Sequence, residues 1–270
     1  MDEIQKITSR ENARLQHFRK VRDGKVADQI FIEGARLAEE TLRTDVSIID
    51  ALVSTDFIGR PRSAPIIAEL IRREIKLIET GPKLFGGIAD TVNSQGIILL
   101  ANRPRTGPIS FDGLSAGQAM FLYLHEISDP SNLGAVFRTA EAADVTGIVI
   151  SARSADPFSP KCLRAGLGSN LRLQIWENAV LQDAADLMKN FNGTTVAADI
   201  KGKLSYTEYS WKGPRMLVMG SEAHGLSDEY LDIAEEIVRI PMKAQIESLN
   251  LAVAAGVILF EAARQRSTDG

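Results

Sequence analysis

The sequence has very little cysteine or histidine and no long apolar run. Its 270 residues include a single cysteine, Cys162, which excludes an internal disulfide and a cysteine zinc cluster. The three histidines, His17, His125 and His224, lack the spacing of metal ligands, so we expect no metal site. No apolar run reaches the roughly 18 residues of a membrane-spanning helix. The N-terminus also lacks the apolar stretch of a signal peptide. These absences favour a cytoplasmic protein that does not bind a membrane.

Basic residues are slightly outnumbered by acidic residues, 31 to 35, and they are concentrated near the N-terminus. The formal net charge is −4, yet residues 1–105 carry 17 Lys and Arg against 15 Asp and Glu, whereas residues 106–270 carry 14 against 20. A basic segment near the start of the chain includes Arg10, Arg14, Arg19 and Lys20. Such a segment suits the phosphates of a nucleic acid. A solvated amphipathic helix explains the same charges equally well, so both interpretations stay open.

Apolar periodicity predicts two α/β domains. Strand-like and helical patterns alternate through residues 1–105, which predicts a compact α/β domain. Residues 106–117 are rich in Gly and Pro, which is typical of a linker. In residues 118–270 strands again alternate with helices, which predicts a mostly parallel sheet.

The expected elements can be placed by residue number. In the first domain we expect helices at 9–22, 35–42, 65–73 and 83–89, and strands at 29–33, 48–54, 76–79 and 96–101. In the second we expect strands at 120–124, 147–151, 171–176, 195–199, 216–219 and 237–240, and helices at 134–143, at 181–191 and after residue 250.

Three turns in the second domain follow predicted strands and carry polar side chains. In the first, residues 129–134, Gly134 permits close backbone approach and starts the expected helix, and Arg138 projects back toward the turn. A guanidinium at the edge of a sheet can bind a phosphate. The competing interpretation is a surface pair between Arg138 and Glu141.

The second turn, residues 220–227, holds Glu222 as a candidate functional acid between two glycines. It is not a Walker phosphate-binding loop, because no Gly-Lys-Ser or Gly-Lys-Thr follows. His224 has no obvious partner, and we expect it to face solvent as a bystander. In the third turn, Ser248 and Asn250 precede a helix of small residues. They are typical helix caps, and capping is compatible with a ligand at the same groups.

The three turns, taken in order, resemble a known set of motifs. The strings DPSNLGAVFRTAEAA, LVMGSEAHGLS and IPMKAQIESLNLAVAAG resemble motifs 1, 2 and 3 of the SpoU/TrmH branch of the SPOUT RNA methyltransferases. The N-terminal string ITSRENARLQHFRKVRDGK with the later FIEGARLAEE resembles the L30e-like substrate-binding domain of many members. The resemblance implies transfer of a methyl group from S-adenosylmethionine to a ribose 2′-hydroxyl of RNA. It also implies a homodimer and a parallel sheet with a deep trefoil knot.

The resemblance assigns roles to residues of this chain. The catalytic positions that it implies are Asn132, Arg138, Glu222, Ser248 and Asn250. The cofactor-binding positions that it implies are Ala198, Met219, Gly220, Ile240 and Leu249. Because a guanidinium normally stays protonated, we expect Arg138 to grip a phosphate and to stabilise the developing alkoxide.

The chain departs from the family pattern at several positions. Motif 1 ends in Ala143, Asp144 and Val145, where an aromatic residue and Gly are usual. Ala244, Ala252 and Gly166 replace a usual Gly, Ser and Ser. None of these changes removes an expected catalytic side chain. In the segment between motifs 1 and 2, Arg164 and Arg172 remain candidate RNA contacts.

The resemblance does not determine which RNA is the substrate. The N-terminal domain favours ribosomal RNA, because family members that act on tRNA often have short extensions in its place. A tRNA 2′-O-methyltransferase is the first alternative, and a catalytically inactive RNA-binding or ribosome-assembly protein of the same fold is the second. A nucleotide-dependent dehydrogenase is disfavoured, since no G-x-G-x-x-G follows a first strand.

Overall fold

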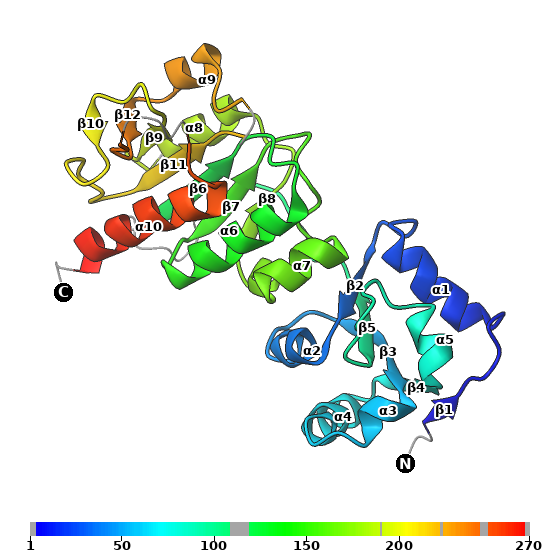
Figure 1. The fold of residues 1–270 in the computed structure, drawn as a ribbon. Helices are drawn as coiled ribbons and strands as arrows, with labels where there is room; N and C mark the ends of the chain where they lie inside the picture. The colour runs from blue at the N-terminus through cyan, green and yellow to red at the C-terminus, as the bar shows by residue number, and fades with distance from the viewer. Residues whose placement is uncertain (1–3, 109–118, 190, 222–223, 244–247, 268–270) are drawn as a thin grey trace. The chain divides into compact units, whose positions relative to one another are not determined.

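The chain folds into two compact units (Figure 1). The computed structural model describes residues 4–108, 119–189, 191–221, 224–243 and 248–267. The first unit contains Met1–Arg105 together with Pro157–Arg172, and the second contains Thr106–Asp156 and Leu173–Gly270. The sequence pattern alone assigns residues 157–172 to the second domain, so their packing with the first unit is a finding of the structure. Among the described residues, no helix is both long and apolar enough to cross a membrane.

The first unit is built on a five-stranded sheet of mixed direction, in the order β1-β4-β3-β5-β2. The strands are β1 (Gln5–Lys6), β2 (Gln29–Glu33), β3 (Ile48–Ser54), β4 (Lys76–Thr80) and β5 (Ile97–Asn102). β1, β4 and β3 run parallel, whereas β5 is antiparallel to both β3 and β2. β5 is buried along its length except at its last residue. An almost wholly apolar run of this kind is typical of a strand covered on both faces.

Helices cover this sheet on both faces. They are α1 (Ala13–Arg22), α2 (Ala35–Thr41), α3 (Thr55–Ile58), α4 (Ser63–Arg72) and α5 (Pro82–Gly86). α1 begins after Asn12, whose side chain accepts the backbone N–H of Arg14 at 2.9 Å. Leu15 and Phe18, three residues apart on α1, are fully buried against the sheet, as helical periodicity requires.

The segment 157–172 forms α7 (Pro160–Gly166) and the 3-10 helix η1 (Ser169–Leu171). α7 packs against β2 of the first unit, with Cys162 and Leu163 fully buried. The prediction of a strand from residue 171 is wrong at its start, because the strand β8 begins only at Gln174. Leu167 and Gly168 both adopt left-handed backbone conformations, which turn the chain before it enters the second sheet.

The second unit is built on a seven-stranded sheet in which every described pairing is parallel, in the order β10-β12-β9-β11-β6-β7-β8. The strands are β6 (Met120–Leu124), β7 (Gly147–Ile150), β8 (Gln174–Trp176), β9 (Thr194–Ala198), β10 (Leu204–Ser205), β11 (Arg215–Met219) and β12 (Glu236–Arg239). The α/β class and the mostly parallel second sheet are therefore confirmed. The order also places β12 between β9 and β10, which are consecutive in the sequence.

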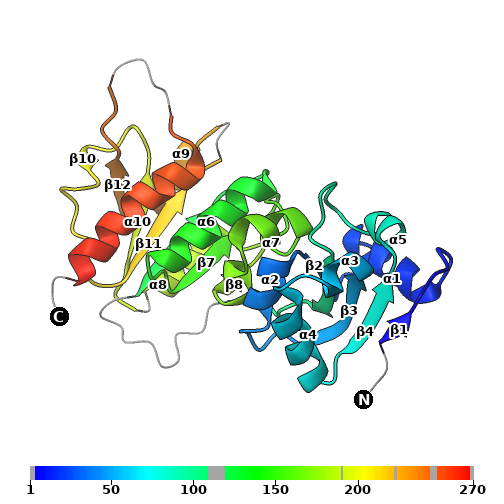
Figure 2. The same cartoon turned by 60° about the horizontal axis from the view of Figure 1, so that its bottom comes forward.

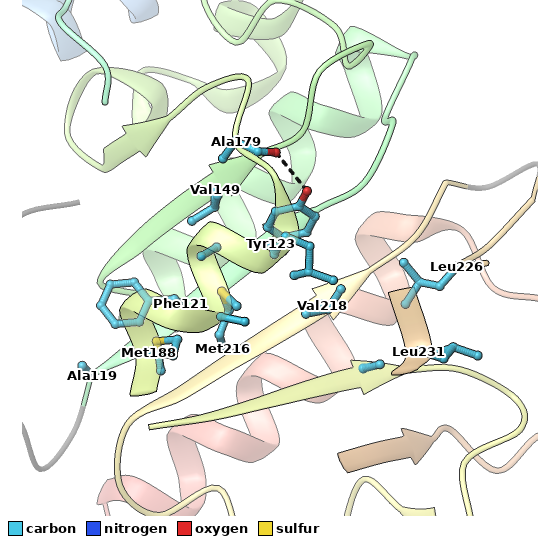
Figure 3. Packing of buried hydrophobic residues seen from close by; sticks show 14 residues of the cluster. Ala119, Phe121, Tyr123, Val149, Ala179, Met188, Met216, Val218, Leu226 and Leu231 are labelled. Carbon is cyan, nitrogen blue, oxygen red and sulfur yellow. Dashed lines mark hydrogen bonds between the residues drawn. The ribbon is translucent and has the colours of Figure 1, made fainter. Parts of the chain in front are cut away.

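Helices of the described residues pack on both faces of this sheet. α8 (Leu181–Lys189) and α9 (Asp228–Ile233) contribute to an apolar cluster with alternate residues of β6 and β11 (Figure 3). Within that cluster the hydroxyl of Tyr123 donates to the carbonyl of Ala179 at 3.0 Å, which satisfies a buried polar group. On the other face, α6 (Pro130–Ala142) and α10 (Leu251–Ser267) lie side by side (Figure 2). A Cβ on Gly256 would lie 3.3 Å from the Cγ2 of Thr139. The lack of a side chain at this position therefore lets the two helices approach closely.

Candidate functional site

A pocket of about 400 Å³ lies in the second unit, where the loops after β9, β11 and β12 meet the start of α10. Parallel strands present their carboxyl ends at one edge of a sheet, and this edge is where α/β proteins commonly bind ligands. The predicted cofactor residues in its lining are Ala198, Met219, Gly220, Ile240 and Leu249. The structure thus brings together at one pocket all five positions that the motifs indicated.

The wall at Gly220 can carry no side chain. A Cβ at this position would lie 2.2 Å from the carbonyl carbon of Gly225, closer than any real contact. The turn is held by a bridge between Ser221 and Gly225, in which the Gly225 N–H donates to the Ser221 carbonyl at 2.9 Å. Gly225 has a φ of 63°, a conformation that glycine adopts without strain. Glycine at both positions folds the motif 2 turn back on itself beside the pocket.

Helix α6 begins four residues earlier than the sequence suggested. Its cap is Asp129, whose side chain accepts the N–H of Ser131 at 2.8 Å, and Pro130 occupies the first helical position. Asn132 therefore lies in the first turn of α6. Arg138 lies more than two turns from this start, whereas a helix that began at Gly134 would have placed it about one turn in.

Motifs 1 and 3 are joined by a side-chain hydrogen bond. The Nδ2 of Asn250 donates to the Oδ1 of Asn132 at 3.2 Å, across 118 residues of sequence. The Oδ1 of Asn250 also accepts the N–H of Ala252 at 3.0 Å, which confirms its predicted role as a helix cap. The side-chain amide of Asn250 thus caps the start of α10 and also bonds to the first turn of α6.

The other proposed catalytic residues differ in how they are placed. Arg138 is exposed on α6, and it forms no hydrogen bond or ion pair with another residue that the structure describes. Its expected alternative partner, Glu141, does not hold it. Ser248 lines the pocket. Glu222, like Ala244 of the altered motif 3, lies outside the described residues.

Sequence reasoning missed part of the pocket. His224 is exposed, as expected, but it also lines the pocket, which the sequence did not lead us to expect. Further lining residues that the motifs did not single out are Asp199, Ile200, Ser221, Gly225, Met242, Leu251 and Ala254. Of these, Ile200, Ser221 and Met242 follow a predicted strand end by one or two residues, and this position is the signal that could have identified them.

A buried histidine lies behind the pocket wall. The backbone N–H of His125 donates to the carbonyl of Met219 at 2.9 Å, and its ring contacts the ring of Tyr230, with centroids 4.0 Å apart and the planes tilted by 41°. Burial lowers the pKa of His125, an effect that the nearby Glu126 carboxylate opposes. The imidazole is therefore held neutral at physiological pH. No group of three or more His, Cys, Asp or Glu side chains suited to a metal ion is found in the described part of the chain.

Apart from Arg138, the predicted RNA contacts belong to the first unit. Arg10 and Lys20 are exposed, whereas Arg14 donates to the Oε1 of Gln5 at 2.8 Å. Arg19 donates to the carbonyls of Arg10 and Gly87. Two further candidates form ion pairs within the unit: Arg164 with Asp90 at 2.7 Å, and Arg172 with Glu40 at 3.2 Å.

Both parts of the chain match family models. Residues 119–260 match the model described as the SpoU rRNA methylase family, and residues 31–107 match the model for RNA 2′-O ribose methyltransferase substrate binding. A Synechocystis protein named as an uncharacterised tRNA/rRNA methyltransferase is 30% identical over 99% of this chain and 98% of its own length. A 23S rRNA (guanosine-2′-O-)-methyltransferase of Xanthomonas axonopodis is 28% identical over 87% of this chain and 96% of its own.

Solved structures resemble the whole chain. An AdoMet-bound rRNA methyltransferase from Sinorhizobium meliloti has a TM-score of 0.83 and 27% identity, covering 96% of this chain and 97% of that one. A crystal structure of an RNA 2′-O ribose methyltransferase has a TM-score of 0.82 and 29% identity, covering 97% and 99%. The similarity therefore spans both units.

Proposed function

The chain belongs to the SpoU rRNA methylase family, and we propose that it transfers a methyl group from S-adenosylmethionine to a ribose 2′-hydroxyl of structured RNA. The observation that carries this proposal is the pocket at the carboxyl edge of the second sheet. Its lining combines all five positions expected to bind the cofactor with Ser248 of motif 3.

The residues at this pocket fit the proposed cofactor. Its volume of about 400 Å³ falls within the roughly 300–1,000 Å³ of small-molecule sites. Met219, Ile240 and Leu249 supply apolar walls for the adenine, and the close-packed turn at Gly220 leaves backbone groups to form hydrogen bonds. When bound, the cofactor supplies an electrophilic methyl group on its sulfonium.

Arg138 is proposed to act on the RNA. A ribose hydroxyl is a poor nucleophile, so the site must orient it and stabilise the negative charge that develops on its oxygen. An exposed guanidinium that no other described residue holds is available to grip the neighbouring phosphate and to provide that stabilisation. The bond between Asn132 and Asn250 would keep α6, which carries Arg138, in register with the loop before α10. Glu222 is proposed to support the motif 2 turn.

Threading of the chain is proposed to form the expected trefoil knot. β12 runs between β9 and β10, which residues 199–203 connect directly. This connection lies against β12: a Cβ on Gly202 would be 2.5 Å from the carbonyl carbon of Val238, and Arg239 donates to the Gly202 carbonyl at 2.6 Å. A connection closed over an inserted strand is the arrangement that a knot requires.

A homodimer is proposed to form through α10 and its neighbour α6. Val253 and Phe260 lie seven residues apart on α10, and each is 52% exposed. Their spacing places them on one side of the helix, where a second copy would cover them. A cytoplasmic location and the lack of a metal requirement remain predictions.

Ribosomal RNA is proposed as the substrate, with tRNA as the alternative. The relative from Xanthomonas is named for 23S rRNA, and the first unit matches a substrate-binding model over residues 31–107. The test is a radiolabelled methyl-transfer assay on rRNA and tRNA from a strain that lacks the gene, together with mapping of 2′-O-methylation in that strain. We expect label in rRNA. Label in tRNA alone would select the alternative.

Titration of S-adenosylmethionine by calorimetry separates an active enzyme from an inactive protein of the same fold. We expect saturable heat from binding to the full-length chain. An absence of heat at millimolar ligand, together with no label in either RNA, would favour an RNA-binding or ribosome-assembly role and overturn the proposed activity.

A further inference from the structure

A second pocket, in the first unit, is lined by four arginines. It measures about 680 Å³ and lies where the turn after α2, the end of β5 and the end of η1 meet. The basic side chains in its lining are Arg43, Arg103, Arg105 and Arg172. Of these, only Arg172 is expected from the sequence to contact RNA. The fold gathers the other three with it from separate segments of the chain.

Glu40 holds two of these guanidinium groups side by side. Its Oε1 accepts from the Nη1 of Arg43 at 2.9 Å, and its Oε2 accepts from the Nη1 of Arg172 at 3.2 Å. One carboxylate thus connects the end of α2 to the end of η1, across 132 residues of sequence. A guanidinium carries five N–H donors, and each of these two bonds orients an arginine with one of its Nη1 donors.

The segment that contains Asn102 and Arg103 is held by a cation–π contact and by backbone hydrogen bonds. The guanidinium of Arg103 lies 4.7 Å from the ring centre of Phe158, in a cation–π contact. The backbone N–H of Asn102 donates to the Ser47 carbonyl at 2.9 Å, and that of Arg103 donates to the Asp28 carbonyl at 2.8 Å. The Asn102–Ser47 bond therefore joins two of the three segments that form the pocket.

The pocket has a surplus of positive charge. Among the described residues, its lining contains four arginines and one acidic residue, Asp45, and Glu40 pairs with two of the arginines. The first unit as a whole carries 20 Lys and Arg against 15 Asp and Glu. This excess favours an anion and disfavours a cation or an apolar ligand.

We propose that this pocket binds the phosphate backbone of the RNA substrate. Arg43, Arg105 and Arg172 are exposed, so a long polyanion can reach them, whereas a site for a small anion would enclose its ligand. Thr44, Ser47 and Asn102 add uncharged polar groups, which commonly join arginine in contacts to phosphate and sugar. The proposal rests on the proposed RNA substrate and adds a contact surface to it.

The test removes the two arginines that are most exposed and least involved in packing. Arg43→Gln with Arg105→Gln is compared with Arg62→Gln with Arg72→Gln, a pair on the same unit that is also exposed and lines none of the pockets described above. Binding of a fluorescein-labelled 12-base-pair hairpin RNA to the full-length variants is measured across a series of KCl concentrations. Thermal melting and heats of S-adenosylmethionine binding verify that each variant is folded.

We expect the pocket pair to weaken hairpin binding by about 10-fold or more at 0.1 M salt. It should also lower the slope of log affinity against log salt by about 1 to 2, since each lost phosphate contact removes roughly 0.7–0.9. The control pair should stay within about twofold of the unmodified chain, as expected of exposed charges that touch no phosphate.

The outcomes separate this proposal from the proposed function. If the unmodified chain methylates rRNA and binds the hairpin, but the pocket pair behaves like the control pair, the pocket assignment is overturned and the methyltransferase assignment stands. If the unmodified chain neither binds RNA nor transfers a methyl group to it, both are overturned.

Discussion

The first unit is basic and the second is acidic. The first carries 20 Lys and Arg against 15 Asp and Glu, whereas the second carries 11 against 20. The contrast is sharper than the sequence order suggests, because residues 157–172 bring three positive charges and no negative charge to the first unit. Folding thus moves basic residues from the middle of the chain to the unit that is proposed to bind RNA.

The pockets of the two units also differ in charge, in the same direction as the units themselves. The first unit has a pocket walled by guanidinium groups, which suit phosphates. The second has a pocket whose described lining contains no Lys or Arg and combines glycine backbone and apolar side chains with Asp199, Ser221, His224 and Ser248, a mixture that suits an adenine-containing cofactor. In the part of the second unit that spans residues 106–156, Arg138 and Arg153 are the only basic residues. Of these two, Arg138 is the one that we propose to contact RNA.

The largest effect is expected from Arg138→Ala. Methyl transfer to rRNA should fall by about 100-fold or more, because the group proposed to stabilise the developing charge is lost. Binding of S-adenosylmethionine should persist, since Arg138 does not line the pocket that is proposed to bind it. A radiolabelled methyl assay measures the first effect and calorimetry the second. Lys189→Ala, which removes an exposed charge of the same unit, is the control, and turnover of the Arg138 variant close to that control would refute its role.

Gly220→Ala should act on the cofactor and not on RNA. The added Cβ would meet the backbone of Gly225 at 2.2 Å, so the turn beside the pocket must move. We expect affinity for S-adenosylmethionine to fall by about 10-fold or more, with hairpin RNA binding unchanged. Gly59→Ala in the first unit is the control, because nothing lies within 4 Å of its added Cβ. Equal affinities for the two variants would show that this turn does not form the cofactor site.

Leu163→Ala tests whether the middle segment belongs to the first unit. Leu163 is fully buried on α7, which packs against β2. Its truncation should lower the free energy of unfolding by about 2–5 kcal/mol, measured by chemical denaturation. Cofactor affinity should stay the same in the folded protein. A loss of cofactor affinity with unchanged stability would instead couple α7 to the second unit.

The smallest effect concerns pH and His125. Burial lowers the pKa of this imidazole in the folded protein, so below about pH 6.5 the unfolded chain binds the proton more readily. Stability should therefore fall as the pH drops through that value. His125→Phe keeps a ring against Tyr230 but cannot titrate. The melting temperature of both proteins is measured at pH 7.5 and at pH 5.5. The drop between these values should be smaller for His125→Phe than for the unmodified chain, and the two drops should differ by no more than about 4 °C. Identical losses would show that His125 does not contribute.

The pattern of apolar and turn residues along the chain predicted many of the strands, because a strand that is buried in a sheet has a continuous apolar run in its sequence. Strands 29–33, 48–54 and 120–124 were predicted residue for residue, since each is an apolar run bounded by turn residues. The short α7 was missed, and the strand at 171–176 was predicted too early. Both errors lie in the segment that packs with the first unit, where long-range contacts override local preference.

The sequence by itself determined the alternation of strands and helices, the parallel second sheet and the presence of polar turns at strand ends, because apolar periodicity and turn chemistry are local properties. Only the tertiary structure decided which distant groups meet. It set Asn250 beside Asn132, β12 between β9 and β10, and Glu40 between Arg43 and Arg172. Such contacts depend on strand order and on shared burial across more than a hundred residues, and no local pattern encodes them.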